Sequence, residues 1–426
     1  NSTTGSPTSN EWNFNSEIVS DIESFGYNVK LSADGNILAV SSPYFENGTG
    51  RFDVYAIEEG SDKTTTWNHL LPASGTKVQG TNASDLMSHG MSLSADGSTV
   101  AIGSPGYGNG LVDIYLIDLK TNTISQKGNT IQGPTPLCEF GFSVALNSLG
   151  TRLFVGAPNY GQSESERIGL VRAYDYNNVT DSWIQVGSDM TGESIDSRFG
   201  HSIASSYDGS KVIVGAPFDS AVAALLNPAA GASFNSTKYE QMGTFYCFTL
   251  DEQFKAWYYY PRNYFYGDAI NAQLGYNVAV DKSGEVIVTS QKHIINASVV
   301  MVYFIDSKLN VIETQSYPVS GAYEDAQFGS QVDISAVGDI IVASDEHREE
   351  ISGAVRAFKT VTGNLVEYGG EIPGIALGSN CKPWGNGPSL SIAITSNVKR
   401  LAIGYECISI DGKQTPASAV HIYKIS

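Results

Sequence analysis

The sequence predicts an all-β fold, a single seven-bladed β-propeller of four-stranded blades. A glycine in a similar setting recurs seven times, roughly 50 to 75 residues apart, which is typical of propeller repeats. Short runs rich in Val, Ile, Tyr, Phe and Thr lie between the 44 glycines and 15 prolines, as in strands separated by turns. The two ends of the chain look like parts of one blade. The recurring glycines are Gly26, Gly90, Gly141, Gly200, Gly275, Gly329 and Gly387.

The first two strands of each repeat follow the glycine. An alternating run such as residues 27–31 has the period of two that predicts a strand. A turn such as Asp34-Gly35 follows, and Asp-Gly predicts a two-residue hairpin in which both central residues have positive φ. The next run, residues 37–40, is continuously apolar. It therefore needs cover on both faces, which neighbouring blades would give.

The second half of the repeat begins where the second strand ends. Small residues and proline stand there, as in residues 156–158 and 215–217, both Gly-Ala-Pro. Proline stops the ladder of hydrogen bonds, and small residues let two backbones approach. A third strand follows, as in residues 50–55. The fourth often starts at tryptophan, as at Trp67, Trp183 and Trp257.

The ends of the chain predict how the ring closes. The last repeat stops after its third strand, residues 420–423, whereas residues 11–14 look like a fourth strand with no repeat before it. The N-terminal strand should therefore complete the seventh blade, which removes the open edges of a linear array. The expected organisation is a flexible, Ser- and Thr-rich lead at residues 1–10 and a propeller over residues 11–426.

These features resemble the FG-GAP repeat of integrin α-subunit propellers, in a variant common in secreted and surface proteins of microbes and algae. Residues 183–217 carry the resemblance best, with Arg-Phe-Gly-His-Ser, then Asp-Gly-Ser, then Val-Gly-Ala-Pro. The pattern is clear in four repeats and weaker in the last three. The resemblance implies adhesion or matrix assembly through loops on one face of the propeller, although no individual integrin contact carries over.

No metal or cofactor is expected. Integrin-type repeats often bind calcium through a D-x-D-x-D-G loop, since calcium takes six to eight oxygen ligands. No such loop occurs in the sequence, and the corresponding turns, residues 32–35 and 206–209, offer one carboxylate each. The net charge of −19 also argues against nucleic acid as a partner, because binding phosphates needs Lys and Arg. No apolar run is long enough for a membrane helix, so no membrane insertion is expected.

Cysteines and glycosylation motifs indicate a secreted or cell-surface glycoprotein. The four cysteines show no CxxC spacing, which suits two disulfides in an oxidising compartment. Cys381 and Cys407 lie within one repeat and are expected to pair, which leaves Cys138 with Cys247. Six N-x-S/T motifs fall in or beside predicted loops. They begin at Asn1, Asn47, Asn82, Asn178, Asn235 and Asn296.

Repeat four is the longest and holds the candidate binding patch. Its apolar loop, residues 219–242, precedes a run of aromatic residues too dense for an alternating strand to bury on one face. Exposed Tyr and Trp suit sugar stacking or a protein hot spot, while ordinary packing between blades remains the alternative. The candidate patch is Trp257, Tyr258, Tyr259, Tyr260, Tyr264 and Tyr266.

The leading hypothesis for function is a non-enzymatic extracellular interaction module, active in adhesion, matrix or surface assembly, that binds a protein or glycan. One alternative is a structural subunit that self-associates into a filament or surface layer. The other is a propeller hydrolase or lyase with a site in the central channel. That site would need acidic, His or Tyr residues converging from the first strands, where the sequence indicates Lys30, Asp281 and Asp333 among mostly small or apolar neighbours.

Overall fold

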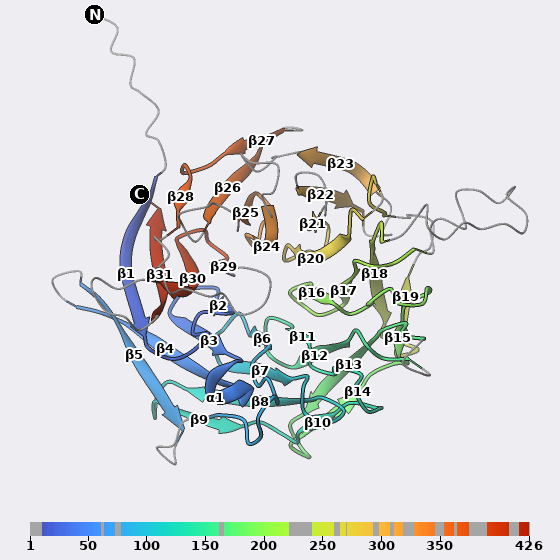
Figure 1. The fold of residues 1–426 in the computed structure, drawn as a ribbon, viewed down its shortest axis with the longest axis horizontal. Helices are drawn as coiled ribbons and strands as arrows, with labels where there is room; N and C mark the ends of the chain where they lie inside the picture. The colour runs from blue at the N-terminus through green and yellow to red at the C-terminus, as the bar shows by residue number, and fades with distance from the viewer. Residues whose placement is uncertain are drawn as a thin grey trace, which may run out of the picture.

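The computed structural model confirms the seven-bladed propeller, with the blades arranged in a ring around one central axis (Figure 1). It describes residues 11–60, 64–72, 78–161, 166–220, 241–259, 265–269, 271–292, 298–306, 311–317, 328–345, 353–361, 364–374, 390–408 and 417–425. Each blade is a four-stranded antiparallel sheet whose first strand is innermost. Within each blade the strands follow one another in the order that the sequence repeat predicts.

The strands of the first four blades follow the chain from the inside outward. Blade 1 is β2 (Val29–Leu31), β3 (Ile37–Ser42), β4 (Arg51–Glu59) and β5 (Thr65–Pro72). Blade 2 is β6 (Gly90–Leu93), β7 (Thr99–Ser104), β8 (Leu111–Asp118) and β9 (Thr123–Gln126). Blade 3 is β11 (Ser143–Leu146), β12 (Arg152–Ala157), β13 (Leu170–Asn177) and β14 (Ser182–Gln185). Blade 4 is β16 (Ser202–Ser205), β17 (Lys211–Ala216), β18 (Thr244–Asp251) and β19 (Ala256–Tyr259).

The remaining blades are built in the same way. Blade 5 is β20 (Leu274–Val280), β21 (Val286–Gln291), β22 (Val299–Ile305) and β23 (Val311–Tyr317). Blade 6 is β24 (Phe328–Ile334), β25 (Ile340–Asp345), β26 (Ala354–Val361) and β27 (Asn364–Glu367). Blade 7 is β29 (Leu390–Ile394), β30 (Arg400–Ile408), β31 (Ala417–Ile425) and β1 (Trp12–Ser20). Short extra elements are α1 (Phe45–Gly48), β10 (Ile131–Gln132), β15 (Met190–Thr191) and β28 (Ile372–Pro373).

The ring closes through the N-terminal strand, as the sequence predicts. β1 pairs antiparallel with β31, from Trp12 opposite Ile425 to Ser20 opposite Ser418. Trp12 is buried and packs in one cluster with Ile340 and Val342 of blade 6. The first and last segments of the described chain therefore share one blade and its core, and β1 and β31 lie side by side in Figure 1.

The core lies between the blades. The second strands β3, β7, β12 and β25 are buried along their whole length. Each hydrophobic cluster draws on adjacent blades; for example, Phe154 of blade 3 packs with Val214 and Trp257 of blade 4. This arrangement explains why the second strands are apolar on both faces.

Glycines at the end of the second strands permit the closest contacts between blades. A Cβ atom on Gly103 would lie 1.9 Å from the carbonyl oxygen of Gly141 in the next blade, and one on Gly215 would lie 2.1 Å from that of Gly275. Any side chain there would displace the neighbouring backbone. The glycine of the Gly-Ala-Pro segment is thus required by packing, as the sequence indicates.

The tryptophans of the fourth strands tie successive blades together. The indole Nε1 of Trp183 donates to the Lys127 carbonyl at 2.9 Å, and that of Trp257 donates to the Val186 carbonyl at 3.0 Å. In each case the acceptor belongs to the preceding blade. Both indoles are buried, so these residues are part of the core.

The predicted disulfide between Cys138 and Cys247 is wrong. Both are buried free thiols, and they belong to different hydrophobic clusters. The Cys138 Sγ donates to the Asn109 carbonyl at 3.0 Å, whereas burial raises the pKa of Cys247 to about 12. The predicted pair Cys381–Cys407 lies outside the described residues, since only the backbone of Cys407 is described.

Candidate functional site

Seven turns surround one mouth of the central channel, and all use the same side-chain device. The side-chain oxygen of the first residue of each turn accepts a hydrogen bond from the backbone N–H of the residue five positions later, at 2.9 to 3.0 Å. In blade 1 the turn is longer than the two residues predicted. The Ser32 N–H donates to the Ile37 carbonyl, and this hydrogen bond encloses four residues. Gly35 has a φ of 75°, whereas Asp34 does not have positive φ, so the prediction that both residues have it is wrong. The acceptors are Ser32, Ser94, Asn147, Ser206, Asp281, Ser335 and Thr395.

The carboxylates of these turns are occupied by the turns themselves. Asp34 accepts from the Ser32 hydroxyl at 2.6 Å and from the Asn36 N–H at 3.0 Å, and Asp208 repeats the pattern with Ser206 and Ser210. We therefore expect 5 mM calcium to leave the melting temperature of the protein unchanged in calorimetry, compared with a sample in EDTA. A large rise with calcium would show that these oxygens bind the ion instead.

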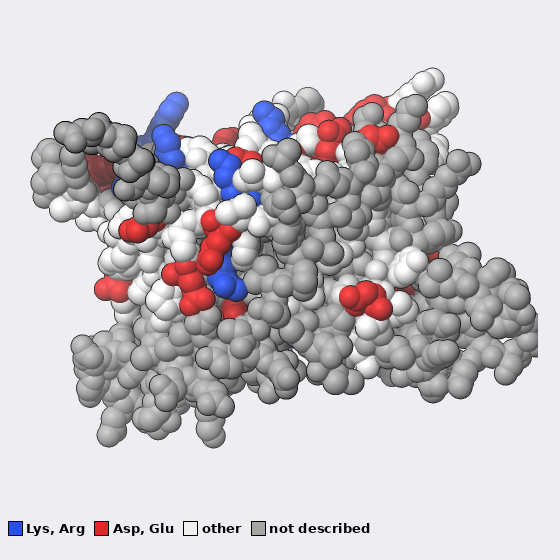
Figure 2. Space-filling view, turned by 90° about the horizontal axis from the view of Figure 1, so that it is seen from above, with Lys and Arg blue, Asp and Glu red and all other residues white. Residues whose placement is uncertain are grey.

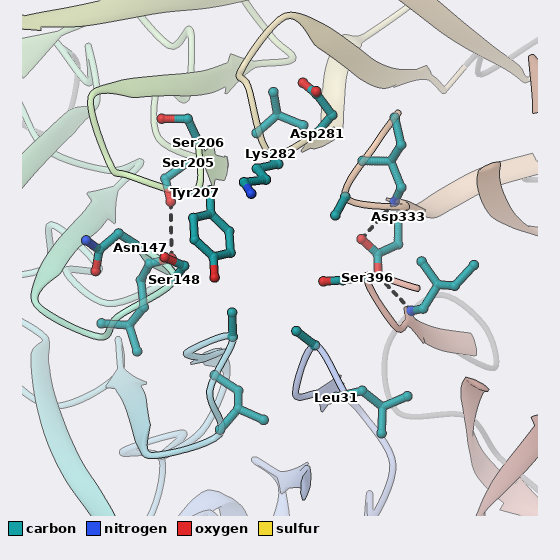
Figure 3. Close-up of a pocket in the computed structure, with 18 of the residues that line it drawn as sticks. Leu31, Asn147, Ser148, Ser205, Ser206, Tyr207, Asp281, Lys282, Asp333 and Ser396 are labelled. Atoms are coloured by element: carbon teal, nitrogen blue, oxygen red, sulfur yellow. Dashed lines mark hydrogen bonds between the residues drawn. The ribbon is translucent and has the colours of Figure 1, made fainter. Parts of the chain in front are cut away.

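A cavity of about 220 Å³ lies at this mouth, and all seven blades line it (Figure 3). Asp333 and Ser396 lie on one side of the opening, and Tyr207 and Lys282 lie across from them. The Lys282 Nζ lies 4.8 Å from the centre of the Tyr207 ring, a cation–π contact. The predicted inner-strand residues Lys30, Asp281 and Asp333 therefore do meet in one cavity.

Asp333 holds two blades together. Its two carboxylate oxygens accept N–H groups of Ile334 in its own strand and Ile394 in blade 7, each at 2.9 Å. Burial raises the pKa of Asp333, while the positive charge of Lys30 and these two hydrogen bonds oppose the rise. With both oxygens engaged, this carboxyl is better placed to fix the channel wall than to react.

Further along the channel, residues at or just before the start of the inner strands of five blades contribute one arc of aromatic rings. Each member stands five residues before its turn residue, about 16 Å away at ~3.3 Å per strand residue. Neighbouring centroids are 5.5, 4.5, 5.1 and 4.9 Å apart. The arc is Tyr27, His89, Phe142, His201 and Tyr276, one from each of blades 1 to 5.

Burial favours the neutral form of the two histidines of the arc. Burial is the main cause that lowers the pKa of His89, and it lowers that of His201 to about 3. A neutral ring donates from one nitrogen and accepts at the other. The Nδ1 atom of each lies close to a carbonyl of the next blade, Phe142 at 3.2 Å and Tyr276 at 3.1 Å, so Nδ1 carries the proton. The Tyr27 hydroxyl donates to His89 Nε2 at 3.1 Å, whereas no hydrogen bond to His201 Nε2 is seen among the described residues.

Two cations lie beside His201. The Lys292 Nζ donates to the Tyr276 hydroxyl at 3.3 Å and lies 4.4 Å from the centre of its ring. The Arg198 guanidinium lies 5.2 Å from the centre of the Phe218 ring. Both charges contribute to the lowered pKa of His201. This end of the channel therefore joins the His201 imidazole, a phenol and two cations.

Sequence reasoning missed this arc because it misplaced one repeat. Gly50 and Gly110 form equivalent bridges to Met87 and Phe140, so Met87-Ser88-His89 corresponds to Phe140-Gly141-Phe142. Ser88, with a φ of 73°, takes the place that the sequence assigned to Gly90. Gly387 lies outside the described residues. Counting back five residues from each turn, rather than aligning glycines, would have found the arc.

The structure divides the predicted aromatic patch. Trp257 is buried, and Tyr259 is half-buried and donates to Glu193. On the same hairpin Tyr258 is 49% exposed and Phe254 is 68% exposed. Tyr266 is 36% exposed, and Tyr260 and Tyr264 lie outside the described residues. Trp257 therefore belongs to the core, while Tyr258 and Tyr266 are left as a candidate surface.

Solved propellers resemble this chain in fold at low sequence identity. Proteins of Bacteroides fragilis and Bacteroides uniformis, both provisionally described as 6-phosphogluconolactonases, each give a TM-score of 0.51 at 12% identity. The first match covers 82% of this chain and 84% of the other, and the second covers 90% and 98%. The periplasmic gluconolactonase of Pseudomonas aeruginosa gives 0.52 at 13% identity over 82% and 86%. No protein-family model and no curated protein matches the sequence. At these identities the likeness shows the fold alone.

Proposed function

We propose that the protein is a hydrolase that acts on a small sugar-derived lactone or ester in its central channel. One observation carries the proposal: His201 just before β16, Tyr276 in β20 and Lys292 just after β21 form a single chain of contacts. Propeller enzymes described as lactonases share the fold, which supports lactones as the first substrates to test. Flat aromatic rings along the channel would stack on a sugar ring.

The residues of the arc have complementary roles in such a reaction. His201 Nε2 accepts a proton from water as the water oxygen bonds to the carbonyl carbon of the substrate. The Lys292 ammonium and the Tyr276 hydroxyl stabilise the negative charge that develops on the carbonyl oxygen. That charge raises the low pKa of His201 as the reaction proceeds. The ring C–O bond then breaks, and the departing oxygen takes the proton from His201.

The direct test is hydrolysis of glucono-δ-lactone, followed with a pH indicator and corrected for spontaneous hydrolysis. The informative variant is His201→Phe, because Phe142 fills the same position in blade 3 and a phenyl ring therefore fits the arc. Its rate should fall about 100-fold or more, the usual contribution of a positioned base. The control is His421→Gln, since His421 pairs with Glu17 on the outer strands of blade 7. It should keep full activity.

Two outcomes would overturn the proposal. The first is that the protein hydrolyses no lactone or ester faster than buffer does. The second is that the His201→Phe variant, shown to be folded by its melting temperature, is as active as the unchanged protein.

A second candidate function is the extracellular interaction module, and exposure of Tyr258 and Phe254 on the β18–β19 hairpin favours it. The resemblance to FG-GAP repeats supports the same reading, with a protein, a glycan or a second copy as partner. A glycan array and pull-downs with Tyr258→Ala test it. The control is Tyr207→Ala, which removes a tyrosine that is 42% exposed at the channel mouth. Equal binding by both variants and the unchanged protein would remove the patch from consideration.

Secretion is the proposed localisation, supported by three glycosylation motifs on exposed residues. Asn47 lies in α1, Asn82 in the loop before β6, and Asn178 in the β13–β14 turn. The motifs at Asn1, Asn235 and Asn296 lie outside the described residues. Expression through a eukaryotic secretory pathway should add glycans at the three exposed sites, seen as mass lost on treatment with an N-glycosidase. Asn→Gln variants at each should remove one glycan apiece, and an unglycosylated secreted product would contradict the proposal.

The distribution of surface charge and the length of the described helix are compatible with both candidate functions. Figure 2 shows one side of the propeller, where acidic and basic side chains are interspersed over the described surface. No helix in the part of the chain that the structure describes is long and apolar enough to cross a membrane.

A further inference from the structure

We propose that the ligand of the aromatic arc carries an anionic group, a phosphate or a carboxylate, that binds between Lys292 and Arg198. The inference deepens the proposed function and rests on it for the location of the substrate. It also makes a claim of its own, because binding of an anion can be measured without any reaction.

Most described arginines of this acidic protein are neutralised by carboxylates. Arg152 pairs with Asp175 at 2.6 Å, Arg172 with Asp189 at 2.8 Å, and Arg400 with Glu59 at 2.7 Å. Such pairing is expected in a chain with 44 acidic and 25 basic residues. Among the described arginines only Arg167 and Arg198 lack an ion pair, whereas most of the described lysines, Lys282 and Lys292 among them, form none with the described residues.

Lys292 and Arg198 are two such cations. The contacts of the Lys292 ammonium are the ring and hydroxyl of Tyr276, and that of the Arg198 guanidinium is the face of Phe218. Neither forms an ion pair among the described residues. Cations resting on aromatic rings keep most of their hydrogen-bonding capacity for a ligand.

Both cations lie near the same part of the channel, the part that contains His201. Arg198 is three residues before His201, whose ring lies 4.9 Å from that of Tyr276, and Tyr276 holds Lys292. The positive charge of each reaches the His201 ring, where both contribute to its lowered pKa. Both charges therefore lie near the His201 ring that the proposed reaction uses.

One carboxyl competes for this position. Glu139 of blade 3 lies near Arg198 and Arg167, whose charges oppose the rise that burial causes in its pKa. It forms no ion pair with either among the described residues, and its buried Oε2 has no hydrogen-bond partner there. Glu139 thus leaves the guanidinium of Arg198 available, and a sugar bearing one anionic group and several hydroxyls fits the combination of cations and aromatic faces.

The test measures binding of glucose 6-phosphate, gluconate and glucose by calorimetry. At least one anion should bind about tenfold more tightly than glucose, and its affinity should fall with added salt. The two anions distinguish two kinds of site. Tighter binding of glucose 6-phosphate identifies a phosphate site, and tighter binding of gluconate identifies a carboxylate site. Lys292→Met keeps the length of the side chain, removes the charge, and should weaken binding of that anion about tenfold.

The matched control is Lys282→Met. Lys282 also rests on a tyrosine ring without an ion pair among the described residues, but at the other mouth of the channel. This variant should bind the anion as the unchanged protein does. The inference is overturned if glucose binds as tightly as both anions, if Lys292→Met has no effect, or if Lys282→Met has the same effect.

These outcomes are distinct from those that test the hydrolase. Hydrolysis of a neutral lactone as fast as a phosphorylated one would refute the anion site and leave the hydrolase standing. Binding of an anion that depends on Lys292, without hydrolysis of any lactone, would support the site and refute the hydrolase.

Discussion

A chain that lacks residues 1–20 should not reach the stability of the full protein, and we expect it to unfold at a much lower temperature or to aggregate. Removal of β1 exposes one edge of β31 and opens the core of blade 7. β1 and β31 share eight register pairs. At about 1 kcal/mol net per backbone hydrogen bond, roughly 8 kcal/mol is lost, which is comparable to the whole stability of a typical domain.

The packing of β1 adds to this loss. Trp12 fills a cluster with residues of blade 6, Ile18 packs against the cluster of Phe25 and Val420, and the indole of Trp67 in blade 1 donates to Ser16 at 3.1 Å. Deletion of β1 therefore weakens the contacts of blade 7 with both neighbours. The ring becomes an open array with two edges.

Two further measurements test this prediction. A chain that lacks only residues 1–10 keeps β1 and should melt as the full protein does. A synthetic peptide of residues 11–20 should raise the melting temperature of the shorter chain when added to it, since a strand can be supplied in trans. Closure by β1 would be wrong if the chain without residues 1–20 melted like the full protein.

The second large effect is expected from Gly103→Ala, which should destabilise the protein by about 3 kcal/mol or more. The new Cβ would lie 1.9 Å from the Gly141 carbonyl oxygen and 2.7 Å from its carbon. Both are backbone atoms, so a rotamer change cannot relieve the contact. Blades 2 and 3 must move apart, and the clusters between them lose packing.

Urea unfolding of a matched variant, Gly108→Ala, provides the control. Gly108 has a φ of 51° and no atom within 4 Å of the added Cβ, so that variant reports only the backbone cost, about 1 kcal/mol. Gly103→Ala should have the lower midpoint of the two. Equal midpoints would contradict the contact between blades that we assign to this glycine.

The fold could be predicted because its signals are local. A period of two, a turn and an apolar run recur in each repeat, and a tryptophan starts several fourth strands, so chain order alone gives the blade. Closure by Trp12–Ser20 followed from counting strands at the two ends. The turn itself was predicted less well, because the carbonyl of Ile37 and the hydroxyl of Ser32 enlarge it in a way that Asp-Gly alone does not show.

The channel site was not predicted, because its residues meet only in space and the repeats were aligned on their glycines. Tyr27, His89 and His201 belong to three blades, and each alone reads as an ordinary strand residue. The substitution of Ser88 for the repeat glycine hid the register of His89. The prediction for Trp257 was wrong for a different reason, because an aromatic residue in an irregular repeat looked exposed. Its indole is buried and donates to the preceding blade, as that of Trp183 does.

His201 should be a neutral, desolvated base in the channel, and NMR can measure this directly. The ring nitrogens of His201, identified by comparison with the His201→Phe spectrum, should show protonation at Nδ1 and no titration between pH 8 and pH 5. The pKa of about 3 should then rise when an anionic sugar binds. A His201 that titrates near the ordinary histidine value of about 6.5, or that carries its proton on Nε2, would contradict the account.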